Sequence, residues 1–234
     1  MISHQHRCIF VHVPKVAGQS VELYFLQDLG IDWKDRAPLL LRPNDDPKMG
    51  PPYLAHLRLN EYVELGYIDQ RSFDQYFKFT LVRDPWSRVH SFYKYEGFNQ
   101  RYSFKSFVTR VLPKLIRQKA WFYGPQYPYV YDANGQTSID FIGRFENISE
   151  DFAKVCTRLN LEDHKLPYRN KSQGKRRWGR KRFLYHLAMW PINAFPLVGD
   201  RIRSSHYRDY YDDELVQRVA ELYAQDVEAF SYQY

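Results

Sequence analysis

The sequence predicts one α/β domain with a central, mainly parallel sheet flanked by helices. Residues 8–13 and 77–82 are short apolar runs rich in β-branched and aromatic residues, which are typical of buried strands. A sharp turn and then a helical pattern follow each run. Strand, turn and helix in succession are typical of parallel sheets, whose sites lie beyond the carboxyl ends of the strands. The 234 residues suffice for one sizeable domain, and we expect it to span residues 1–234.

The first turn, after residues 8–13, is suited to bind a phosphate. Pro14 ends the strand, Gly18 supplies a tight turn, and Ser20 is expected at the N-cap of the helix. Backbone N–H groups and the positive end of the helix dipole would then point at one spot, to which Lys15 adds a full charge. The expected phosphate ligands are the side chain of Lys15, the Ser20 hydroxyl, and the backbone amides of Val16, Ala17, Gly18, Gln19 and Ser20.

The second turn, residues 83–91 with the sequence RDPWSRVHS, repeats this arrangement. Asp84 is expected to cap a helix whose first residue is Pro85. Arg83 and Ser91 place a guanidinium and a hydroxyl about two helical turns apart, which suits two-point capture of one phosphate. Both turns should open on the same edge of the sheet, where one ligand can touch both.

The other elements follow from periodicity and turn signals. Further strands are expected over residues 53–59 and 139–144. Further helices are expected over residues 60–65, 72–76, 104–117 with an interruption at Pro113, 147–159, and 213–230 with Asp212 as the cap. Residues 33–52, 124–135 and 173–203 are expected to be loops, and the first and last of these are expected to vary most.

Composition limits the classes of partner and the cellular compartment that we expect for this protein. The formal net charge of +7 favours an anionic partner. Cys8 and Cys156 cannot form a disulfide framework and are expected to be reduced and buried, and no cluster has metal-ligand spacing, so no metal is expected. Neither a secretory signal nor an apolar run of membrane-spanning length is visible. We therefore expect a cytoplasmic protein.

Residues 12–20, HVPKVAGQS, resemble the H-I-P-K-T-A-G-T-S signature of the Golgi-type carbohydrate sulfotransferases, a group that includes the heparan sulfate 2-O-sulfotransferases. The pattern R-D-P-x-x-R-x-x-S resembles the 3′-phosphate element of sulfotransferases that use 3′-phosphoadenosine 5′-phosphosulfate (PAPS). Residues 141–152, 166–172 and 206–216 also resemble segments of this family. The resemblance covers most of the chain except 33–52 and about 173–203, and it implies a P-loop-like sulfotransferase fold in a soluble, bacterial member.

The resemblance implies in-line sulfuryl transfer from PAPS to a hydroxyl of a carbohydrate acceptor, without a metal. Lys15 would neutralise charge on the leaving phosphate, residues 16–20 would bind the 5′-phosphate, and Arg83 with Ser91 would bind the 3′-phosphate. Lys171 and Ser172 would help close this donor site. His56 lies where the catalytic histidine of the family falls and is the expected general base, with Glu22 as the alternative.

Other interpretations remain open at this stage. A P-loop-type nucleotide kinase is disfavoured because Lys15 precedes Gly18, whereas the lysine of that loop follows its second glycine. A non-catalytic protein that binds anionic glycans or nucleic acid would explain the charge but not two ordered phosphate motifs. As an enzyme, the chain is expected to bind no nucleic acid. The acceptor could be an acidic polysaccharide or a glycolipid, and residues 175–198 could contact the inner face of a membrane peripherally. The oligomeric state is not predicted.

Overall fold

The computed structural model describes residues 1–162, 165–167, 204 and 206–234. These residues form an α/β domain around a four-stranded sheet in the order β1-β2-β3-β4. The strands are β1 (Ile2–Ser3), β2 (Cys8–Val11), β3 (Phe77–Val82) and β4 (Phe141–Arg144). β2, β3 and β4 run parallel, and β1 pairs antiparallel with β2. The predicted fold class is therefore confirmed.

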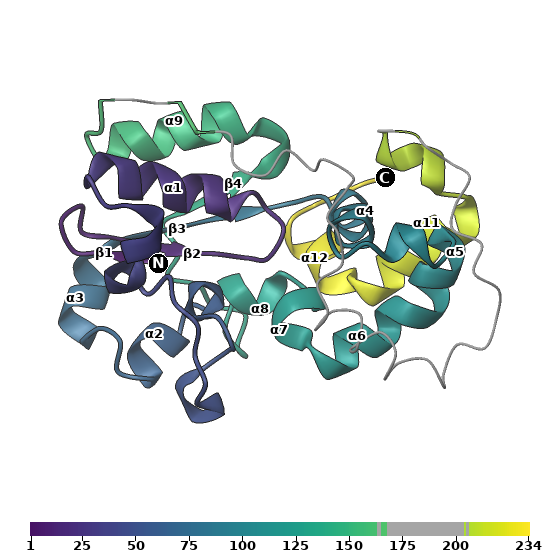
Figure 1. Cartoon of the computed structure of the whole chain (residues 1–234), viewed down its shortest axis with the longest axis horizontal. Helices are drawn as coiled ribbons and strands as arrows, with labels where there is room; N and C mark the ends of the chain where they lie inside the picture. The colour runs from purple at the N-terminus through teal and green to yellow at the C-terminus, as the bar shows by residue number, and fades with distance from the viewer. Residues whose placement is uncertain (163–164, 168–203, 205) are drawn as a thin grey trace.

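Helices cover both sides of the sheet (Figure 1). On one side, α1 (Gly18–Asp28) lies beside α9 (Ile148–Arg158), and the rings of Tyr24 and Phe152 meet there with centroids 4.9 Å apart. On the other side lie α2 (Glu61–Glu64) and α3 (Gln70–Gln75). This layering buries β2 completely, which explains its uninterrupted apolar run.

α4 (Pro85–Tyr95) leads from the end of β3 into a helical half of the molecule (Figure 1). Asp84 caps it by accepting a hydrogen bond from the Ser87 N–H at 2.9 Å, as predicted. The Trp86 indole joins α4 to α11 by donating to the carbonyl of Val216 at 3.0 Å. The other helices of this half are α5 (Phe104–Ser106), a π-helical segment (Phe107–Val111), α6 (Leu112–Gln118), α7 (Ala120–Tyr123), α8 (Tyr127–Val130), α11 (Asp213–Leu222) and α12 (Ala224–Ala229).

The aromatic content of the chain fills the core around the sheet. Phe10 of β2 stacks on Phe79 of β3 with ring centroids 5.0 Å apart, and the Thr80 hydroxyl donates to the carbonyl of Val11 at 2.7 Å. Cys8 and Cys156 are buried free thiols, as expected. Burial raises the pKa of Cys8 to about 12, so this thiol is unreactive at neutral pH.

Two predicted elements were wrong, and the interruption of a third was confirmed. Residues 53–59 form no strand: they contain a 3-10 turn, Leu54–His56, and one isolated bridge. The helix predicted over 104–117 is divided near Pro113, as expected: the π-helical segment ends at Val111, and Pro113 lies in the first turn of α6, where its missing N–H has little effect. The last predicted helix is divided between α11 and α12 at Tyr223.

The loops differ in how far the structure describes them. The loop over 33–52 is ordered by three 3-10 turns, Trp33–Asp35, Ala37–Leu39 and Pro47–Met49. The loop predicted over 124–135 contains the short helix α8. Lys171, Ser172 and the segments 173–203 and 175–198 lie outside the described residues. Of the helices that are described, none is both long and apolar enough to cross a membrane.

Candidate active site

The carboxyl ends of β2 and β3 bring the two expected phosphate-binding turns together. Val11 of β2 is in register with Thr80 of β3, so the turns after the two strands begin at the same edge. The turns also touch, since Nη1 of Arg83 donates to the carbonyl of Lys15 at 3.1 Å. The structure therefore brings the two turns to one edge of the sheet.

The turn before α1 has a strained backbone. Lys15 has a φ of 74° and Ala17 a φ of 66°, in the left-handed region that costs a non-glycine residue about 1 kcal/mol or more. Ala17, not Ser20, is the N-cap, and no side chain caps the helix. Ser20 lies within the first turn, where its N–H donates to the carbonyl of Ala17 at 2.9 Å. The remaining expected amides precede Ser20, at a left-handed to helical junction of the kind that gathers N–H groups around an anion.

Gly18 allows this turn to approach His12 closely. A Cβ at Gly18 would lie 2.1 Å from Cδ2 and 2.2 Å from Nε2 of His12, far inside van der Waals contact. Glycine is therefore required by the neighbouring ring and not by a positive φ. His12 thus packs directly on the turn before α1.

Arg83 is held at the second turn with part of its donor capacity unused. Its Nε and Nη2 donate to the Ser87 hydroxyl at 3.0 and 2.8 Å, and its guanidinium lies 3.9 Å from the centroid of the Phe145 ring. With Nη1 on Lys15, three of the five N–H groups have partners among the described residues, which leaves two for a ligand. Burial lowers the pKa of Arg83 to about 10, so the side chain stays charged at neutral pH.

The side chains of Arg83 and Lys15 both contact one face of α4. Ser87, Ser91 and Tyr95 are spaced four residues apart and therefore follow one another along the helix surface. The Arg83 guanidinium binds Ser87 at one end, and Nζ of Lys15 lies 3.5 Å above the centroid of the Tyr95 ring at the other. Ser91 lies between them, over a span of about 12 Å along the helix. Ser87 and Tyr95 were not predicted as site residues, although their spacing was a possible signal.

His56 lies against His12, which packs on the turn before α1, and it has the tautomer that a general base requires. Its Nδ1 is 2.9 Å from the carbonyl of His12, and a carbonyl can only accept, so Nδ1 carries the proton and Nε2 keeps its lone pair. Desolvation, together with the neighbouring His12, lowers the pKa of His56 well below 6.5. Its ring lies 5.8 Å from that of Trp121, centroid to centroid. His56 is therefore neutral at pH 7.

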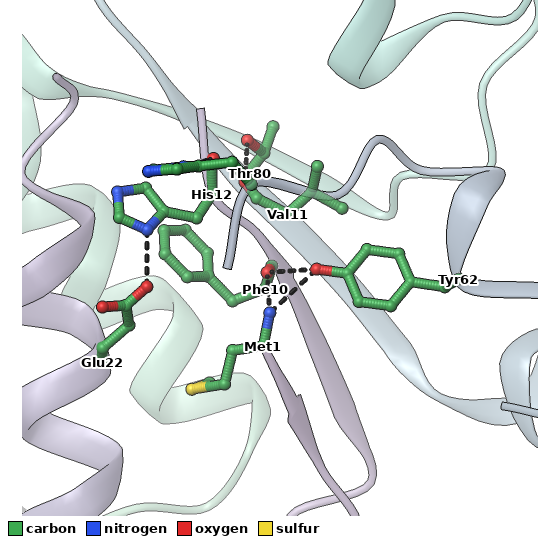
Figure 2. A network of polar contacts seen from close by, with 8 residues as sticks. Met1, Phe10, Val11, His12, Glu22, Tyr62 and Thr80 are labelled. Atoms are coloured by element: carbon green, nitrogen blue, oxygen red, sulfur yellow. Dashed lines mark hydrogen bonds and ion pairs between the residues drawn. The ribbon is translucent and has the colours of Figure 1, made fainter. Parts of the chain in front are cut away.

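Glu22, the alternative base, is already engaged. Its Oε1 lies 2.5 Å from Nδ1 of His12, and both side chains are buried (Figure 2). A carboxylate in this position orients the His12 ring and has little room for a substrate hydroxyl. The buried pair of Glu22 and His12 had no signal in the sequence, because ten residues separate the two positions.

In the described part of the chain, no group of three or more His, Cys, Asp or Glu side chains could hold a metal ion. Lys15 and Arg83 offer two cationic partners for an anionic ligand, and the neutral His56 offers a proton acceptor near the first turn.

Comparison with known proteins identifies the family of the chain. Residues 1–233 match the model of a family described as the sulfotransferase family. An uncharacterized protein of Archaeoglobus fulgidus is 32% identical over 102 residues, which cover 41% of this chain and 78% of that protein. No solved structure matches the chain significantly. Because the family match spans nearly every residue, the chain belongs to the sulfotransferase family.

Proposed function

We propose that the protein is a PAPS-dependent O-sulfotransferase that acts on a carbohydrate hydroxyl. The observation that supports this most directly is the face of α4, on which the Arg83 guanidinium and the Lys15 ammonium bracket Ser91. Two cations separated along one surface suit a nucleotide with phosphates at both its 5′ and 3′ positions. ATP and ADP lack the 3′-phosphate, so this arrangement favours PAPS as the donor.

In the proposed reaction, Nε2 of His56 accepts the proton of the acceptor hydroxyl as its oxygen attacks sulfur. The bond between sulfur and the bridging oxygen breaks, and its electron pair goes to the 5′-phosphate of the leaving adenosine bisphosphate. Lys15 neutralises the charge that develops there, a preorganised electrostatic role. The turn before α1 holds the 5′-phosphate, and Arg83 with Ser91 holds the 3′-phosphate.

A carbohydrate acceptor is supported by the aromatic surroundings of His56. The Trp121 ring is inclined 35° to the His56 ring, and the Tyr53 ring, with a residue exposure of 54%, lies 6.5 Å from Trp121. The electron-rich faces of such rings attract the polarised C–H groups of a sugar ring. A sugar stacked there would place a hydroxyl within reach of Nε2 of His56.

Calorimetric titration without magnesium tests the donor assignment. Adenosine 3′,5′-bisphosphate should bind at least about tenfold more tightly than ADP, since each hydrogen bond to a charged group contributes roughly 1.5–3 kcal/mol. Arg83→Ala should abolish this preference while the melting temperature confirms that the variant is folded. Equal binding of the two nucleotides by the wild-type protein would refute the proposal and favour a kinase-type site.

A further inference from the structure

We propose that Gln126 and Asp226 are positioning residues that hold Arg83 in place for the 3′-phosphate of the donor. The proposal rests on the proposed function, in which Arg83 binds that phosphate. Neither residue belongs to the two phosphate-binding turns, and neither would touch the donor.

Gln126 binds both main-chain polar atoms of Arg83. Its Oε1 accepts from the Arg83 N–H at 2.9 Å, and its Nε2 donates to the Arg83 carbonyl at 2.7 Å. Only one orientation of the amide satisfies both bonds, so the side chain acts as a two-point clamp. Gln126 is fully buried, which strengthens the clamp and makes its loss costly.

Gln126 binds Arg83 directly beyond the last hydrogen-bonded pair of the sheet. The ladder between β3 and β4 ends at the pair Val82 and Arg144, so Arg83 is the first residue of the turn beyond it. The polar atoms of the Arg83 backbone therefore need partners from outside the ladder. Gln126 supplies them, and Glu146 does the same for the next residue by accepting from the Asp84 N–H at 2.9 Å.

Asp226 fixes Gln126 from the C-terminal part of the chain. Its two carboxylate oxygens accept from the N–H of Gln126 at 2.7 and 2.9 Å, and one of them also accepts from the N–H of Tyr127 at 2.8 Å. Asp226 is fully buried in α12. A buried carboxylate is tolerated at this position because the N–H groups of Gln126 and Tyr127 donate hydrogen bonds to it. The relay thus runs from α12 through Gln126 to the backbone of Arg83.

The position of the Arg83 backbone matters because it determines where the guanidinium lies. The Nε and Nη2 bonds to Ser87 and the Nη1 bond to Lys15 leave two N–H groups for the ligand only while Arg83 keeps its place. A displacement of about 1 Å in such a group can cost up to about 100-fold in function. Loss of the clamp should therefore weaken recognition of the 3′-phosphate specifically.

The test compares two nucleotides that differ only in the 3′-phosphate. Gln126→Leu removes both bonds to Arg83 and leaves the bonds of Asp226 to the backbone intact. Titration with adenosine 3′,5′-bisphosphate and with adenosine 5′-monophosphate should show the preference for the bisphosphate reduced about tenfold, with monophosphate affinity unchanged. Tyr62→Phe is the matched control, since it removes a buried hydrogen bond to the carbonyl of Phe10 and touches neither nucleotide turn.

The outcomes separate the two proposals. A wild-type protein without a preference for the bisphosphate refutes the proposed function, and the positioning role falls with it. A wild-type preference that Gln126→Leu retains, or that the control loses equally, refutes the positioning role alone. Asp226→Asn provides a second variant if Gln126→Leu does not fold: it keeps one acceptor oxygen and should show a smaller loss in the same direction.

Discussion

Replacing Gly18 by alanine tests how the phosphate turn packs on His12. The new methyl group would lie 2.1, 2.2 and 2.6 Å from Cδ2, Nε2 and Cγ of the His12 ring. An ordinary contact between such atoms is 3.4–4 Å, so the ring or the turn must move by more than 1 Å. Either movement changes the backbone that is expected to hold the 5′-phosphate.

The His12 ring has little freedom to retreat. Its Nδ1 is bonded to the buried Glu22, and its ring lies 5.5 Å from that of Phe10 and 4.5 Å from that of His56, centroid to centroid. Overpacking of a close-packed interior costs about 1–3 kcal/mol. Gly18 has no positive φ, so a loss of stability at this position would come from the clash and not from backbone strain.

The assay is urea denaturation of the wild type, Gly18→Ala, His12→Ala and the double variant. Gly18→Ala should lower the free energy of unfolding by about 1–3 kcal/mol and weaken the binding of adenosine 3′,5′-bisphosphate. The double variant should be more stable than the sum of the two single losses predicts, because removal of the ring removes the clash. A Gly18→Ala protein within about 0.5 kcal/mol of the wild type, or strict additivity, would refute this reasoning.

Three predictions concern two histidines. Turnover should hold steady from about pH 7.5 to about pH 6, because the pKa of His56 lies well below 6.5 and Nε2 stays unprotonated; a rate that halves near pH 6.5 would contradict this. His56→Asn should cut turnover by about 10²–10⁴ and leave bisphosphate affinity unchanged. Burial lowers the pKa of His90 to about 3, whereas a histidine in the unfolded chain titrates near 6.5. The unfolded state therefore binds one more proton between these values, and His90→Phe should make the loss of stability from pH 6 to pH 5 shallower by about 1.4 kcal/mol per pH unit in urea denaturation; an unchanged slope would rule this out.

Elements with local signals could be predicted from the sequence. β3 matches its predicted range and α4 begins at the predicted Pro85, because an apolar run, a capping aspartate and a proline act over a few adjacent residues. Residues 53–59 misled the prediction because contacts with distant parts of the chain, and not pairing with a neighbouring strand, fix their side chains. Leu54 is buried, and Nδ1 of His56 binds the carbonyl of His12, 44 residues away. β1 was missed because a polar segment forms a strand only when β2 is already in place beside it.

The candidate site likewise contains parts with local sequence signals and parts that depend on contacts between distant residues. Both turns are local sequence features, and the structure brings them together at one edge of the sheet as expected, whereas their binding of phosphate stays a prediction. The assignment of Ser20 as the N-cap was wrong. The clamp on Arg83 involves Gln126, 43 residues further along the chain, and the support of Asp84 comes from Glu146, 62 residues further along. No periodicity or motif connects positions so far apart. These contacts exist only once the strands and helices are packed.

His12 connects the two halves of the proposed chemistry. Its ring packs on Gly18 in the turn for the 5′-phosphate, and its carbonyl fixes the tautomer of His56. Glu22 orients the ring from the opposite side, so this carboxylate supports both functions without contacting a substrate. The consequence is an asymmetry between the two histidines. A change at His56 removes the base and leaves the donor turn intact, whereas a change at His12 disturbs the donor turn and the base together, so loss of turnover in a His12 variant does not identify His12 as a catalytic residue.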